Sequence, residues 1–156
     1  MEWLAPISQT VVARSLTASP IVYLLVNAAH IMGIAILFGA ILALDLRLLG
    51  IGRALPIAPA ALYLSRLSAT GLALAVTTGL CLFSVRPVEY AANAAFLSKL
   101  ALVGLGVVNI LLIHRSSGWR RLHAGADPSA TLRLGATISI LIWAGAIIAG
   151  RWIGFL

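Results

Sequence analysis

Four long runs of apolar residues, separated by short polar segments, dominate the pattern of the chain. They cover residues 21–44, 67–85, 91–113 and 134–150. A helix needs roughly 17–25 mostly apolar residues to cross the hydrocarbon core of a bilayer, and each run meets that length. We therefore predict an all-α integral membrane protein, a four-helix bundle formed by residues 1–156 as one domain.

Helix-breaking residues stand between the runs, and small residues recur inside them. The breakers are Pro20, Pro56, Pro59, Pro87 and Pro128, which mark the ends of the predicted spans. Small residues spaced four apart predict close approach between helices; they are Ala29 with Gly33, then Gly71, Ala75 and Gly79, and finally Gly145 with Ala149.

Residues 2–18 precede the first run and have a helical pattern of their own. Apolar residues at helical spacing lie opposite two polar ones, with Trp3, Leu4, Ile7 and Val11 on one side and Glu2 and Gln9 on the other. This pattern predicts a short amphipathic helix that lies in the outer interface of the membrane.

The composition agrees with a membrane protein, with 62% hydrophobic and 10% charged residues and a net charge of +7. The basic residues are distributed by loop rather than gathered on one soluble face. This distribution fits the positive-inside rule of membrane proteins and excludes nucleic acid as the expected partner. The loop after the first run holds Arg47, Arg53 and Arg66, and the loop after the third holds Arg115, Arg120, Arg121 and Arg133. We predict that both loops are cytoplasmic, and that both termini lie on the outer side of a bacterial inner membrane.

Two ionisable residues lie well inside the apolar runs. His30 is about 14 Å along the first span and Lys99 about 12 Å along the third, at 1.5 Å per residue. Both spans run inward in this topology, so the two side chains are expected at similar depth. Because charges in hydrocarbon are costly, such residues are candidates for function.

His30 is the candidate ligand of a metal or a haem b. Tyr23 and Asn27 share its helix face, and an imidazole is a common axial ligand of haem iron. Gly33 and Gly106 are expected to leave room for a flat macrocycle.

A second histidine ligand is missing. His114 lies roughly 22 Å deeper than Lys99, and His123 falls in a loop. The iron would be five-coordinate, or ligated by Lys99 or by a histidine of another chain. Copper is less favoured, since Met32 faces away from His30 and Cys81 has no visible partner.

Other interpretations stay open at this point. His30 could instead bond a neighbouring helix, through Asn27 or Tyr23, while Lys99 extends to the interface; a proton or ion pathway is a further alternative. Arg86 and Arg151 could hold haem propionates or anchor helix ends. Asp45 and Arg47 are expected to form an interfacial ion pair.

The chain resembles a family of small bacterial four-helix membrane proteins classed as a domain of unknown function. The resemblance covers nearly the whole chain and rests on H-x-x-G-x-A at residue 30, D-L-R-L-L-G at residue 45 and T-G-L-x-L-F at residue 78. More distantly, it is similar to the membrane domain of copper-resistance D proteins and to the bacterial four-helix protoporphyrinogen oxidase. These likenesses imply functional roles for His30 and Lys99.

Together these observations predict a membrane protein that holds haem b or a related redox cofactor at His30. It would act as an electron-transfer module or as the membrane subunit of a redox complex, with lipid and other transmembrane subunits or further copies of itself as partners. The alternatives are a cofactor-free structural or assembly subunit, and a transporter of copper or a small molecule.

Overall fold

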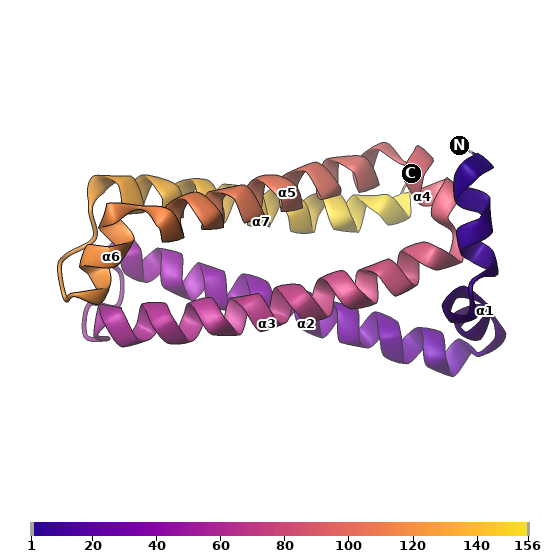
Figure 1. The fold of residues 1–156 in the computed structure, drawn as a ribbon, viewed down its shortest axis with the longest axis horizontal. Coiled ribbons are helices and arrows are strands. Elements are labelled where there is room, and N and C mark those ends of the chain that lie inside the picture. The colour runs from indigo at the N-terminus through magenta and orange to yellow at the C-terminus, as the bar shows by residue number, and fades with distance from the viewer. Residues whose placement is uncertain (1, 156) are drawn as a thin grey trace.

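The chain folds into four long helices that run alternately up and down (Figure 1). The structure is a computed structural model and describes residues 2–155. The long helices are α2 (Pro20–Leu48), α3 (Ile57–Val85), α5 (Ala94–Arg115) and α7 (Ala130–Trp152), the last continued by η2 (Ile153–Phe155). All four are long and apolar enough to cross a membrane, and the described residues contain no strand. The predicted all-α membrane bundle is confirmed.

Short helices lie at the two ends of the bundle. We call one end the α4 end: it holds α4 (Pro87–Ala92) and both termini, and η1 (Glu2–Gln9) and α1 (Val11–Ala18) lie across it (Figure 1). The opposite end, the α6 end, holds α6 (Ser117–His123) and the loop between α2 and α3. The two termini therefore lie at the same end of the molecule.

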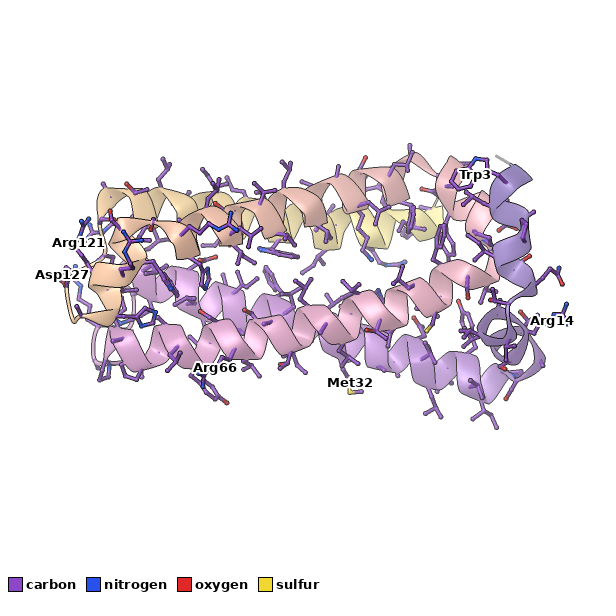
Figure 2. The ribbon with its side chains drawn as sticks, in the orientation of Figure 1. Trp3, Arg14, Met32, Arg66, Arg121 and Asp127 are labelled. Carbon is purple, nitrogen blue, oxygen red and sulfur yellow. The ribbon has the colours of Figure 1, made fainter. Side chains whose placement is uncertain are left out.

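The N-terminal segment is two helices rather than the single one expected over residues 2–18. Thr10 divides them, because its hydroxyl accepts a hydrogen bond from the Ala13 amide and caps α1. The apolar face also differs from the prediction: Leu4 is buried, whereas Trp3 is 76% and Val11 82% exposed (Figure 2). Trp3 and Leu4 belong to η1, and a 3-10 helix, which turns every three residues, presents a different set of side chains than an α-helix does.

Short polar side chains begin most of the helices. Each accepts a hydrogen bond from a backbone amide in the first turn, and the residues are Thr10, Ser19, Asn93, Ser116 and Ser129. Such N-caps satisfy amides that have no partner within the helix. The starts of these five helices are thus fixed by capping side chains, whereas α3 and α4 begin without one.

Helix α3 is longer than the run of apolar residues that predicted it. It begins at Ile57 rather than at residue 67, and Pro59 lies in its first turn. Backbone amides in the first turn have no acceptor within the helix, so a proline there costs no hydrogen bond. Arg66 consequently lies on the exposed outer surface of this helix and not in a loop (Figure 2).

Glycines bring α2 and α3 into backbone contact. A Cβ on Gly33 would lie 2.7 Å from the amide nitrogen of Ala75, and one on Gly71 would lie 2.5 Å from that of Leu37. Any larger side chain at either position would force the helices apart. The close approach predicted from the spacing of small residues is confirmed for this pair of helices.

Helices α5 and α7 pack differently, with glycines of one helix opposite long side chains of the other. Gly106 receives the indole of Trp143, since a Cβ there would lie 2.7 Å from its Cζ2. Gly150 receives the aliphatic part of Lys99 in the same way. The space beside Gly106, and the space beside Gly33, is thus filled by the protein itself. The prediction that these glycines leave room for a macrocycle is wrong.

Helices α2 and α3 form one hairpin and α5 and α7 the other, and the two hairpins meet along α2 and α7. An apolar cluster at the α6 end joins α2, α3, α6 and α7, and Ile113 of α5 packs against it. Its members are Leu44, Leu48, Ala61, Trp119, Leu122, Leu132 and Ala136. A smaller cluster of Leu37, Ile41 and Trp143 follows toward the centre. Helix α3 packs on α2, α2 on α7 and α7 on α5. Helices α3 and α5 meet through side chains, and the rings of Phe83 and Phe96 stack with centroids 5.5 Å apart.

We predict that Gly33→Ala weakens the fold and that Gly39→Ala in the same helix does not. The Gly33 substitution overpacks a backbone contact and is expected to lower the free energy of unfolding by about 1–3 kcal/mol. Gly39 has no heavy atom within 4 Å of its Cβ position, and alanine favours helix by up to about 1 kcal/mol. Denaturant titration of both variants in detergent micelles measures the difference, and equal stabilities would contradict this account of the α2–α3 contact.

Candidate functional site

His30 is held in place by α3 rather than by its own helix. Its Nδ1 lies 2.9 Å from the carbonyl oxygen of Ala75 and 3.1 Å from Oγ1 of Thr78. Because a carbonyl oxygen can only accept, Nδ1 carries the hydrogen and donates it. In the neutral imidazole Nε2 therefore keeps its lone pair.

The neighbourhood of His30 is made by the residues that follow Ala75 in α3. The Thr78 hydroxyl donates to the Leu74 carbonyl at 2.6 Å, which leaves its oxygen free to accept from Nδ1. Gly79 lies against the ring, since a Cβ there would be 3.0 Å from Cε1 of His30. The expectation that His30 bonds to another helix is confirmed, but Asn27 and Tyr23 are not its partners.

Lys99 approaches His30 from the other hairpin. The lysine extends along α7, with Nζ 3.4 Å from the Cβ position of Gly150. It lies within Coulombic range of the imidazole, and none of the hydrogen bonds among the described residues involves its ammonium. His30 and Lys99, which were expected at similar depth in the membrane, thus lie in one region of the bundle.

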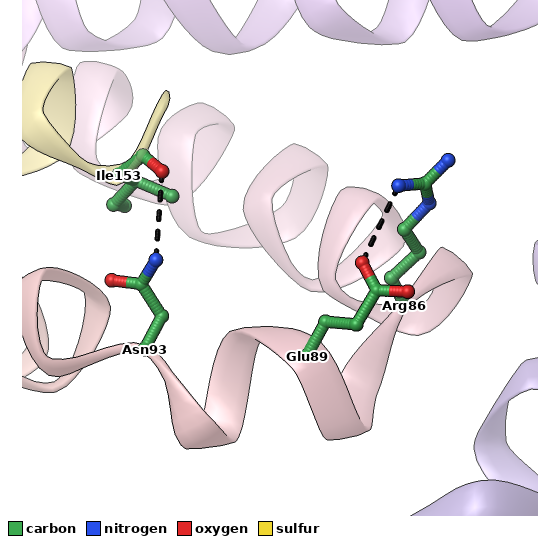
Figure 3. Close-up of polar contacts among 4 residues, drawn as sticks. All are labelled: Arg86, Glu89, Asn93 and Ile153. Atoms are coloured by element: carbon green, nitrogen blue, oxygen red, sulfur yellow. Dashed lines mark hydrogen bonds and ion pairs between the residues drawn. The ribbon is translucent and has the colours of Figure 1, made fainter. Parts of the chain in front are cut away.

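The remaining predicted site residues lie around the α4 end. Tyr23 and Asn27 are exposed on α2, and the Tyr23 hydroxyl lies close to that of Tyr90 in α4. Arg86 pairs with Glu89 at 3.3 Å on the surface (Figure 3). The Arg151 guanidinium lies over the Phe155 ring, 4.6 Å from its centroid. Each arginine thus has a partner close to it in the sequence.

Asn93 was not singled out in the sequence, yet it connects two helices at this end. Its Oδ1 accepts from the amides of Ala95 and Phe96 and so caps α5. Its Nδ2 donates to the Ile153 carbonyl at 3.5 Å, beyond the end of α7 (Figure 3). An asparagine after a short helix and before an apolar run is the signal that identifies such a cap.

Asp45 is the largest departure from the sequence-based picture. Its side chain is buried, with the residue 6% exposed, and Oδ2 has no hydrogen-bond partner among the described residues. The expected ion pair with Arg47 is wrong, because the Arg47 Nε donates to the Leu55 carbonyl at 2.8 Å instead. Asp45 lies in the last turn of α2 and faces a cavity of about 170 Å³ near the α6 end.

The other two histidines lie at the α6 end. His114 is in the last turn of α5, donates from Nδ1 to the Ile110 carbonyl at 2.8 Å and packs on Trp119, with ring centroids 4.2 Å apart. His123 is the last residue of α6 and is exposed, so it lies in a helix and not in the predicted loop.

Comparison with known proteins adds one result to this geometry. A family model matches residues 11–156, nearly the whole chain. The chain belongs to DUF6644, a family of unknown function. No curated protein and no solved structure matches this DUF6644 chain. The resemblance to an uncharacterised family is therefore confirmed, whereas the likenesses to copper-resistance D proteins and to the protoporphyrinogen oxidase find no support.

Sulfur ligands are not gathered at His30 in this DUF6644 protein. Met32 points away from the bundle on the outer side of α2 (Figure 2) and is 56% exposed. Cys81 is free and partly buried. Within residues 2–155 there is also no group of three or more His, Cys, Asp or Glu residues placed to hold a metal ion. A site at His30 would thus depend on this one imidazole and on Lys99.

We predict that neutral His30 is the Nδ1-protonated tautomer. In protein labelled with ¹⁵N-histidine, the His30 signals, identified by their loss in His30→Gln, should show a protonated Nδ1 and an unprotonated Nε2. Thr78→Val should preserve this tautomer, because the Ala75 carbonyl still accepts the hydrogen bond. A protonated Nε2 in the neutral ring would contradict the geometry.

Proposed function

We propose that this membrane protein binds haem b, or a related redox cofactor, through Nε2 of His30. The observation that carries the proposal is the hydrogen bond from Nδ1 to the Ala75 carbonyl. A ligating histidine characteristically donates its other ring nitrogen to a backbone carbonyl or a carboxylate, which fixes the ring and increases its basicity. The chemistry of His30 therefore fits a residue that would hold a metal-containing group through Nε2.

Lys99 is the second residue that would hold the group. In its neutral form Nζ would offer a lone pair to the metal, and in its charged form it would hold a propionate. Tyr23, Asn27, Arg86 and Arg151 lie toward the same end of the bundle and would bind the polar edge of the group. A bound haem supplies one-electron transfer, and the protein would be an electron-transfer module or the membrane subunit of a redox complex.

A second candidate is a cofactor-free structural or assembly subunit. The specific observation in its favour is the exposure of α5, since only 6% of the apolar part of this helix is buried by the rest of the chain. Lipid, other transmembrane subunits or a second copy of the chain would cover that face. In either case we propose that the arginine-rich α6 end faces the cytoplasm of a bacterial inner membrane.

We predict that the purified protein, isolated from cells supplied with haem, shows a Soret band that depends on His30. His30→Ala should abolish the band, and external imidazole should restore part of it by filling the vacated ligand position. His123→Ala is the matched control and should keep the band, because His123 is exposed at the opposite end. Lys99→Met should shift the band if Nζ is the second ligand.

The alternatives give different results in the same preparation. A colourless protein without metal by elemental analysis would refute the cofactor proposal and favour the assembly subunit. If the wild-type protein contains copper and His30→Ala does not, the result would favour copper over haem as the bound group.

A further inference from the structure

The cavity at Asp45 is separate from the His30 region and is built by all parts of the bundle near the α6 end. Residues of α2, α3, α5, α6 and α7 line its volume of about 170 Å³. Most of the wall is apolar, and the polar lining residues are Asp45, Ser65, Ser68, Asn109, His114 and Ser139. Binding sites for small organic molecules typically combine an apolar wall with a few placed polar groups in this way.

The hydroxyl groups from α3 present acceptors to the cavity. Ser68 donates its hydrogen to the Ser65 carbonyl at 2.9 Å, and Ser65 donates its own to the Ala61 carbonyl. A serine whose hydrogen is used in its own helix retains oxygen lone pairs and has no donor left. These two side chains therefore cannot satisfy an acceptor on a ligand.

The polar groups of α5 are committed in the same way. Asn109 donates from Nδ2 to the Gly135 carbonyl at 3.1 Å, and His114 donates from Nδ1 to the Ile110 carbonyl at 2.8 Å. What remains is the amide oxygen of Asn109 and, in the neutral ring, Nε2 of His114, both of which accept. Apart from the hydroxyl of Ser139, the polar side chains that line the cavity therefore offer acceptors rather than free donors.

Asp45 adds a carboxyl group to this set, and the group carries a negative charge when it is ionised. Its Oδ2 is fully buried and has no partner among the described residues, and Ser139 of α7 is the polar side chain beside the carboxyl group. No lysine or arginine is among the residues that line the cavity. A buried carboxylate is strongly unfavourable without a cation or donors to compensate it. A positively charged donor is therefore the complement that an ionised Asp45 lacks.

We propose that this cavity binds a small organic cation, a protonated amine with a short hydrocarbon part. The ammonium group would donate to Asp45 and the surrounding acceptors, and the apolar wall, which includes Leu72 and Trp119, would hold the hydrocarbon. A cavity of about 150 Å³ accommodates benzene, so a ligand of about six heavy atoms matches the volume. A bare alkali ion would leave most of the apolar wall uncovered. The inference is independent of the proposed function of His30.

The test is isothermal titration calorimetry of n-butylammonium chloride into the protein in lipid nanodiscs, with empty nanodiscs as the blank and constant ionic strength. We expect saturable binding to the wild-type protein and at least about tenfold weaker binding to Asp45→Asn, because a charge-assisted hydrogen bond is lost. Asp127→Asn is the matched control, since Asp127 is an exposed loop carboxylate, and it should bind as the wild type does. 1-Pentanol, a neutral analogue of similar size, should not bind.

Several results would overturn the proposal. They are the absence of saturable butylammonium binding, equal affinity in Asp45→Asn, and equal affinity for 1-pentanol. Displacement of the amine by millimolar sodium would likewise refute it in favour of an inorganic cation site. If Asp45→Asn does not fold, the comparison of butylammonium with pentanol and with sodium on the wild-type protein still decides the question.

Discussion

The backbone contact of α2 with α3 at Gly33 and Gly71 is the constraint on which the arrangement of functional groups depends. Ala75, whose amide nitrogen lies against Gly33, also offers the carbonyl oxygen that accepts from His30. The same crossing therefore sets the helix separation and the orientation of the imidazole. Farther along α2, the face that follows this contact carries Leu37 and Ile41 into the core and ends at Asp45.

Hydrogen bonding divides the interior into two kinds of polar group. Most serine and threonine hydroxyls, and His114, bond to carbonyls of their own helix, which satisfies them in a medium without water. His30 and Asn109 instead bond across helices and so link α2 to α3 and α5 to α7. Among the described residues, the fully buried side-chain atoms without a partner are Oδ2 of Asp45 and Nε1 of Trp143. At these two atoms the interior lacks a hydrogen-bond partner.

The four long helices followed from the length of the apolar runs, whereas the short helices α4 and α6 and the capping residues were not predicted. The pairing of His30 with Lys99 could be anticipated because depth along a helix is a simple function of residue number. Asp45 could not be placed, because whether a residue near a helix end faces water or the core depends on how far the helix extends and which helix packs against it. The partners of His30 were beyond prediction for the same reason, since Ala75 contributes only its backbone. The packing at Gly33 and Gly106 likewise depended on the partner helix, which contributes backbone at Gly33 and the Trp143 indole at Gly106.

The position of the Asp45 cavity has a consequence for how molecules would reach it. Two of its lining residues, Ala69 of α3 and His114 of α5, are exposed on the outer surface of the bundle. In a membrane, that surface faces acyl chains and headgroups rather than bulk water. A molecule that enters there is drawn from the lipid phase, so its effective concentration at the cavity is governed by its partition coefficient into the bilayer. Lengthening a ligand's hydrocarbon part would then raise its local supply as well as its contact with the walls.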